Sequence, residues 1–138
     1  HDCGKYCSAK EQIKLCRKKG ISLTDSEIEM PALVHAKLSA YLAEHEYSIN
    51  DSGILDAITY HTTGRPDMTM LEKIIYIADY IEPNRAEIPG LNEVRFLAFE
   101  DIDQAVCRSA GATTRYLQDG GKAVDPMTIR TYNFYKKE

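Results

Sequence analysis

Hydrophobic side chains recur along the chain at intervals of three and four residues, the period of an amphipathic helix, and no segment alternates strictly as a half-buried strand would. Ser8 followed by Glu11 is typical of a capping box, and Gly20 is typical of a helix C-terminus, so a first helix is expected between them. Further helices are predicted over about 31–46, 50–62, 69–82, 92–118 (as one helix or a pair) and from Pro126 onward.

The segment that follows Thr69 carries the clearest helical pattern. Thr69 and Glu72 form a second capping-box signature, and Pro83 ends the segment. The β-branched run 74–77 has strand propensity, but the capping signature before it favours a helix. Its apolar positions, which are expected to face the core, are Leu71, Ile74, Ile75, Ala78 and Ile81. The chain is therefore predicted to be an all-α helical bundle.

Composition and charge indicate one globular domain. The chain has 138 residues, 43% of them hydrophobic and 28% charged, so residues 1–138 are expected to form a single domain. A net charge of -4 argues against nucleic acid and anionic membranes as partners. No apolar run approaches the roughly 18 residues of a membrane span, and four cysteines are too few for a disulfide framework. A cytoplasmic location is therefore predicted.

Polar side chains occupy three positions where the helical pattern predicts core: His35, His61 and Asp79. Each alone is more often a hydrogen-bonded or paired structural residue than a metal ligand. Together with the adjacent His1 and Asp2, they supply imidazoles and carboxylates from separate helices, as dinuclear sites in helical bundles do. Two metals about 3.5–4 Å apart, bridged by a carboxylate and a hydroxide, are suited to attack on a phosphoryl group.

The cysteines near the start of the chain leave a second metal hypothesis open. Cys3, Cys7 and Cys16 with His1 offer thiolate and imidazole ligands for zinc. Cys3 and Cys7 have no second ligand pair at zinc-finger spacing, so reduced cysteines that serve packing are favoured.

The order of these residues resembles that of the HD-domain metal-dependent phosphohydrolases. The sequence HTTGRP, which begins at His61, and the sequence LEKIIYIADYIEPNR, which ends at Arg85, are similar to the YqeK-type branch, the symmetrical bis(5'-nucleosyl)-tetraphosphatases. The resemblance covers essentially the whole chain. It implies an HD-domain helical bundle that cleaves diadenosine tetraphosphate into two ADP by a metal-bound hydroxide at a di-iron centre.

The resemblance also implies a set of metal ligands. They are His1, Asp2, His35, His61 and Asp79. Asp2 would bridge the metals and, with Lys5, would serve catalysis. An upstream His, which this sequence does not contain, would bind one metal with His1 and Asp79, and the other two histidines would bind the second. The domain is therefore expected to lack its N-terminal helices. Iron is favoured, and manganese, cobalt and zinc accept the same ligands.

Basic and polar residues near these ligands are candidates for contacts with the substrate. A guanidinium matches phosphate oxygens in pairs. The candidates are Lys5, Thr62, Arg65, Arg85, Arg130 and Asn133. Three alternatives stay open: an HD phosphohydrolase of another nucleotide (a dNTP or a guanosine alarmone), a non-catalytic nucleotide-binding module, and an inert helical bundle. A second copy of the chain, in a homodimer, is a further candidate partner.

Overall fold

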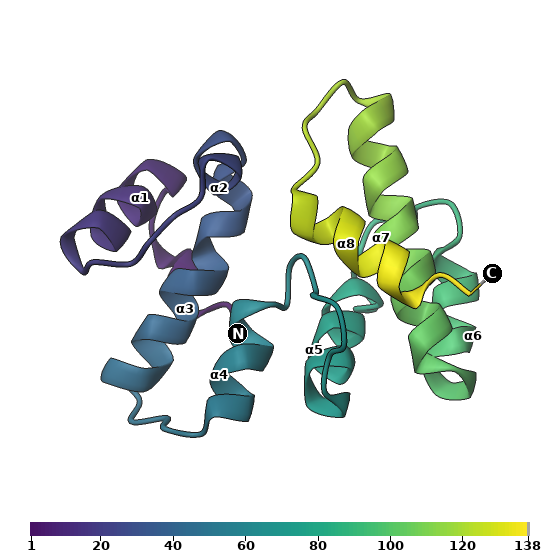
Figure 1. Ribbon diagram of the computed structural model, residues 1–138, viewed down its shortest axis with the longest axis horizontal. Coiled ribbons are helices and arrows are strands. Elements are labelled where there is room, and N and C mark those ends of the chain that lie inside the picture. Colours follow the sequence, from purple (N-terminus) through teal and green to yellow (C-terminus); the bar gives the residue numbers. More distant parts are fainter. Residues whose placement is uncertain (138) are drawn as a thin grey trace.

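The computed structural model describes residues 1–137 and is helical, with no strand in that range (Figure 1). The elements are the 3-10 helix η1 (Cys3–Tyr6), α1 (Ala9–Lys18), α2 (Asp25–Glu29), the 3-10 helix η2 (Pro31–Leu33), α3 (Val34–His45), α4 (Ser52–Thr59), α5 (Met70–Tyr80), α6 (Leu91–Glu100), α7 (Ile102–Asp119) and α8 (Pro126–Tyr135). The all-α prediction is confirmed. Within the described residues, no helix has both the length and the apolar character that crossing a bilayer requires.

Local signals explain where most of these helices begin. In a capping box, the first residue's hydroxyl accepts from the backbone N–H three residues on, and the glutamate there accepts in return. The boxes pair Ser8 with Glu11 before α1, Thr24 with Glu27 before α2, and Thr69 with Glu72 before α5. The helix α2 was not predicted, although its capping signature is as plain in the sequence as the other two.

The helices form two groups, each with its own apolar core (Figure 1). In the first group, α1 packs on α3 around Cys16, Val34 and Leu38. In the second, α5 and α6 pack on α7, and α8 packs along α7. The contact between α4 and α5 joins the two groups. The polar residues of interest come from the elements on both sides of this junction.

The predicted inward face of α5 is wrong for Leu71, Ile74 and Ala78, which are exposed, whereas Ile81 packs against the second core as predicted. Leu71 and Ile74 are 40% and 46% exposed, while the buried side carries Glu72, Tyr76 and Ile77. The hydrophobic pattern of α5 runs nearly all round the helix, so periodicity did not identify the face that α4 and α7 cover. A buried glutamate is tolerated because Arg65 and the helix N-terminus contact its carboxylate.

Two helix boundaries refine the expectations. The segment predicted over 92–118 as one helix or two is a pair, separated at Asp101, which caps α7 by accepting from the backbone N–H of Gln104. The helix predicted over 50–62 ends at Thr59, so His61 lies in the turn that follows α4.

Candidate metal centre

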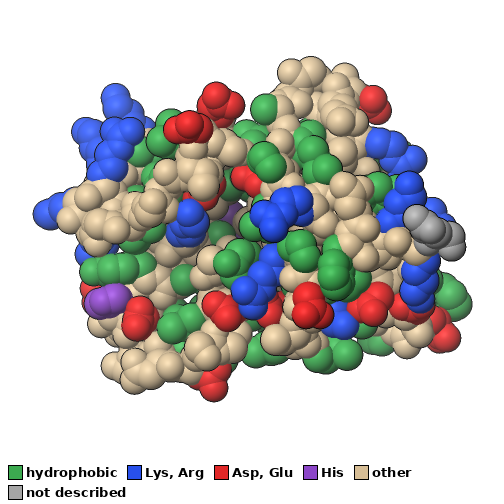
Figure 2. All heavy atoms as spheres, in the orientation of Figure 1, with side chains coloured by type: hydrophobic (Ala, Val, Ile, Leu, Met, Phe, Trp, Pro, Cys, Tyr) green, Lys and Arg blue, Asp and Glu red, His purple; other side chains and the backbone are tan. Residues whose placement is uncertain are grey.

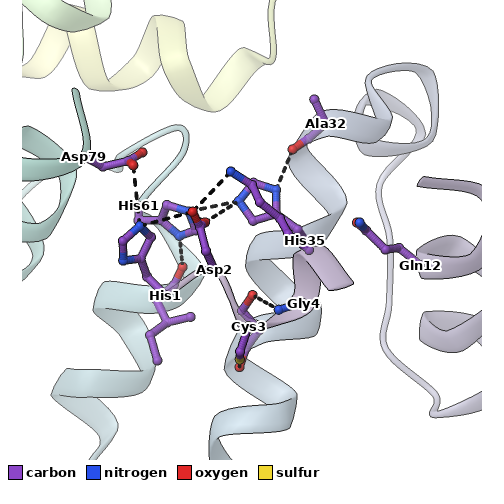
Figure 3. Close-up of polar contacts among 12 residues, drawn as sticks. His1, Asp2, Cys3, Gly4, Gln12, Ala32, His35, His61 and Asp79 are labelled. Carbon is purple, nitrogen blue, oxygen red and sulfur yellow. Dashed lines mark hydrogen bonds and ion pairs between the residues drawn. The ribbon is translucent and has the colours of Figure 1, made fainter. Parts of the chain in front are cut away.

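The five predicted metal ligands converge at the junction of the two helix groups (Figure 3). His1 and Asp2 precede η1, and His35 lies in the first turn of α3. His61 follows α4, and Asp79 lies in the last turn of α5. Four separate stretches of the chain thus supply imidazole and carboxylate groups to one place. The ligand atoms form two overlapping groups in which all atoms lie within 4.8 Å of one another.

Asp2, His35 and His61 form the tighter of the two groups. The Oδ1 atom of Asp2 lies 3.2 Å from Nε2 of His35 and 3.3 Å from Nε2 of His61. The two Nε2 atoms are 3.0 Å apart. Ligand atoms bound to one metal at about 2.0–2.1 Å lie roughly 3.3 Å from each other in tetrahedral geometry. The spacing of these three atoms is therefore that of ligands around a single cation.

The backbone orients both imidazoles toward this point. Nδ1 of His35 lies 2.7 Å from the carbonyl oxygen of Ala32, and Nδ1 of His61 lies 2.6 Å from that of Ile58. A carbonyl oxygen only accepts, so each Nδ1 carries the proton and each Nε2 of the neutral ring presents a lone pair. Oδ1 of Asp2 is buried and has no hydrogen-bond partner. Three electron-pair donors thus converge with no proton to share, and a cation satisfies all three.

The second group extends the cluster toward α5. Nε2 of His1 lies 3.5 Å from Oδ1 of Asp79 and 3.5 Å from Oδ2 of Asp2. The His1 ring meets the His61 ring edge-on, with centroids 4.7 Å apart. The Asp2 carboxylate therefore faces His35 and His61 with one oxygen and His1 with the other. A carboxylate in this position has the geometry to bridge two cations.

Burial sets the protonation states that such a centre requires. His61 and His35 are 2% and 6% exposed, and this burial lowers the pKa of each imidazole, although the backbone hydrogen bond acts in the opposite direction. Burial also acts to raise the pKa of Asp2, but the hydrogen bond and charge of Lys5, together with the nearby His35 and His61, outweigh it, so the net shift is downward. Near neutral pH the cluster therefore offers neutral imidazoles and an ionised carboxylate.

Lys5 is held beside the cluster. Its Nζ lies 3.2 Å from Oδ2 of Asp2, three residues earlier, and the side chain is half exposed. A cation at this distance stabilises the ionised carboxylate. The exposed part of the side chain leaves the ammonium accessible to an anionic ligand.

The other predicted substrate contacts lie in different surroundings. Arg65 contacts the buried Glu72 at 2.6 Å and Asp56 at 3.4 Å, and its guanidinium lies over the ring of Tyr60. Arg85 donates to the backbone oxygen of Asp79, so it lies at the edge of the cluster. The remaining candidates are placed as follows: Thr62 lines a cavity beside His61, while Arg130 and Asn133 are exposed on α8.

The cysteines take no part in the cluster. All four are free thiols, and in residues 1–137 no group of metal-binding geometry contains one. The thiol of Cys3 donates to the backbone oxygen of Ser39, and Cys16 is fully buried in the first core. The zinc–thiolate hypothesis built on Cys3, Cys7, Cys16 and His1 is therefore wrong for this structure, because among residues 1–137 the candidate metal groups contain only histidine and aspartate.

A cavity of about 180 Å³ lies between the α2–α3 side of the molecule and α8. Its lining includes Ala36 and Thr62, the residues after His35 and His61, together with Glu27 and Lys37. Figure 2 shows a histidine side chain deep in the hollow on this face. Glu27 and Lys37, which form an ion pair of 2.8 Å, were not among the predicted site residues. The capping signature of α2 was the signal that would have placed Glu27.

Comparisons with known proteins agree with this geometry. No family model matches the chain. It is 47% identical over 136 residues to the symmetrical bis(5'-nucleosyl)-tetraphosphatase of Bacillus subtilis (strain 168), which covers 97% of this chain and 71% of that protein. The corresponding protein of Halalkalibacterium halodurans is 41% identical over 133 residues, which covers 96% of this chain and 70% of that protein.

A solved structure gives the same result for the fold. The crystal structure of a predicted HD superfamily hydrolase involved in NAD metabolism from Clostridium acetobutylicum superposes with a TM-score of 0.91 at 41% identity. The match covers 98% of this chain and 71% of that one. Identity and coverage at this level show that the chain belongs to the symmetrical bis(5'-nucleosyl)-tetraphosphatases of the HD superfamily.

Proposed function

We propose that this protein hydrolyses diadenosine tetraphosphate symmetrically, into two ADP, at a dinuclear metal centre built on the Asp2 cluster. The observation that carries the proposal is the convergence of Asp2 Oδ1 with the Nε2 atoms of His35 and His61, three acceptor atoms with no proton between them. Two divalent cations at such a site would neutralise phosphoryl oxygens and lower the pKa of a bound water. Iron is the proposed metal.

The chain's own residues supply the rest of the proposed mechanism. The fixed tautomers of His35 and His61 keep both Nε2 atoms ready for ligation without a change of protonation. Asp2 would hold the two cations between its neighbours, and the hydrogen bond and charge of Lys5 favour its ionised state. The ammonium of Lys5 contacts a phosphate of the substrate, where it offsets negative charge as the phosphoryl group is transferred.

The substrate's two halves would extend to either side of the cluster. On one side, the cavity between α2, α3 and α8 offers hydroxyls and an ammonium, among them those of Thr62 and Lys37. On the other side, Arg85 lies at the C-terminal end of α5, next to Asp79. Arg65 has a structural role in this proposal, because its guanidinium is held by Glu72 and Asp56.

The proposed reaction is tested by identifying its products. The protein is purified without oxygen, its metals are measured, and diadenosine tetraphosphate is supplied. Two molecules of ADP are expected from each substrate molecule. AMP with ATP would contradict symmetrical cleavage, and hydrolysis confined to a dNTP or a guanosine alarmone would favour the alternative substrates instead.

The first mutational prediction separates substrate binding from metal binding. Lys5→Ala is expected to raise KM or lower kcat by about tenfold while the metal content stays that of the wild type, since an ammonium ligates no metal. The matched control is Lys10→Ala, an exposed lysine on α1. Steady-state kinetics and elemental analysis of both variants check this. Loss of metal from Lys5→Ala would contradict the assignment to phosphate.

A further inference from the structure

We propose that Ser39 is a positioning residue of the metal centre: it fastens the segment that carries His1 and Asp2 to α3, in register with His35. This inference rests on the proposed metal centre, because its purpose is to hold Asp2 where a cation is bound. Within residues 1–137, the hydrogen bonds of Ser39 to this segment go to Cys3 and Gly4 and not to a candidate ligand side chain, so it acts through the backbone that carries Asp2. Nothing in the sequence pattern of metal ligands points to it.

The side chain of Ser39 is fully buried on α3, one turn after His35. Its hydroxyl accepts a hydrogen bond of 2.8 Å from the backbone N–H of Gly4. Its backbone oxygen accepts from the thiol of Cys3 at 3.4 Å. Two consecutive residues of η1 are thus hydrogen-bonded to one residue of α3. Both contacts join residues more than thirty positions apart, so they are tertiary anchors rather than local turns.

Gly4 is the residue that lets η1 approach so closely. A Cβ atom at this position would lie 2.8 Å from Oγ of Ser39 and 2.9 Å from the carbonyl oxygen of His35. Such distances are shorter than van der Waals contact, and the second one is to backbone that α3 holds in place. The contact therefore depends on both residues, because the absence of a side chain at Gly4 makes room for the hydroxyl of Ser39.

The anchor is linked rigidly to Asp2. The backbone N–H of Lys5 donates to the carbonyl oxygen of Asp2 at 3.0 Å and closes the turn around Gly4. One end of this short unit is fixed to Ser39, and the other places Oδ1 of Asp2 3.2 Å from Nε2 of His35. Without the anchor, the segment would have to be ordered when a cation binds. Ordering costs conformational entropy for each residue that is fixed, and this cost weakens binding of the cation.

The test compares two buried serines. Ser39→Ala removes the anchoring hydroxyl, and Ser109→Ala removes an equally buried hydroxyl on α7, which contacts the carbonyl oxygen of Val106. Mn²⁺ binding to the full chain is measured by calorimetry. We expect Kd to rise about tenfold in Ser39→Ala, the lower end of the effect of outer-shell partners, and to stay unchanged in Ser109→Ala. An unchanged Kd in Ser39→Ala, or an equal rise in both variants, would overturn the proposal.

A second readout needs no metal. In the metal-free chain, amide hydrogen exchange at Gly4 is expected to be faster in Ser39→Ala than in the wild type, and unaffected by Ser109→Ala. Faster exchange with unchanged Mn²⁺ affinity would reduce Ser39 to a structural residue and overturn its positioning role. A wild-type chain that binds no Mn²⁺ would contradict the metal centre itself, and exchange at Gly4 would still show whether the anchor exists.

Gly4→Ala disturbs the same contact at Gly4 instead of at Ser39. This variant provides the test if Ser39→Ala does not fold. Its added methyl group meets Ser39 and His35, so Mn²⁺ affinity is expected to fall about tenfold or more. The control is Gly120→Ala after α7, where the nearest atom to a new Cβ lies at 3.4 Å, an ordinary contact. Wild-type Mn²⁺ affinity in Gly4→Ala would overturn the proposal.

Discussion

His61→Ala is expected to reduce hydrolysis of diadenosine tetraphosphate by more than about 100-fold, beyond the largest loss seen when outer-shell partners are removed. His61 is 2% exposed and belongs to both ligand groups of the cluster. Its Nε2 atom faces Asp2 and His35 at 3.3 and 3.0 Å. Removing the ring therefore removes a ligand from the centre of the site rather than from its edge.

Elemental analysis should show less metal in the same variant, with the helical fold retained by circular dichroism. His45→Ala is the matched control, because His45 is an exposed histidine that stacks on Tyr41 at the end of α3, outside the cluster. Its activity and metal content should be those of the wild type. Full turnover with undiminished metal in His61→Ala would show that the cluster is not the active centre.

Arg65→Ala is expected to lower the free energy of unfolding by about 3 kcal/mol, the lower end of the cost of breaking a buried ion pair. The carboxylate of Glu72 is 1% exposed, and Arg65 contacts both of its oxygens, at 2.6 and 3.1 Å. Without Arg65 the buried charge loses its cationic partner and keeps hydrogen bonds from Thr69, among them the one from its backbone N–H. The expected loss lies at the lower end of that range because the Arg65 side chain is 29% exposed, so this ion pair is only partly buried.

Urea unfolding measures this loss, and Arg115→Ala on the surface of α7 is the control.

Burial raises the pKa of Glu72, but Arg65 and Thr69 outweigh it, so the net shift is below the ordinary value of 4.5. The ion pair therefore stabilises the fold above pH 4.5, and its contribution disappears as the pH falls through the lowered pKa. The difference between wild type and Arg65→Ala should shrink over that acidic range. Wild-type stability with a raised KM would instead favour a phosphate contact.

Most of the fold could be predicted from the sequence because its signals are local. The capping boxes before α1 and α5, and Asp125 followed by proline before α8, fix helix starts within a few residues. The buried face of α5 could not be predicted, because it depends on what packs against the helix. The pairing of Glu72 with Arg65 allows a charged residue into the core and leaves Leu71 outside it.

As with the fold, only part of the candidate site could be predicted from the sequence. The candidate ligands could be singled out from their chemistry and order, since imidazoles and carboxylates within apolar stretches of sequence are unusual. The groups that orient them could not, because they are the backbone oxygens of Ala32 and Ile58, and any residue type supplies a carbonyl. Ser39 could not be predicted for a related reason. A serine on a helix is common, and only the close approach of Gly4 gives this one a role.

Anomalous diffraction from crystals of the protein grown with Mn²⁺ tests the central claim most directly. We predict a peak about 2.0–2.2 Å from Nε2 of His35, Nε2 of His61 and Oδ1 of Asp2, with a second peak next to His1 and Asp79. Crystals that bind Mn²⁺ elsewhere, or leave these atoms without a peak at saturating metal, would contradict it.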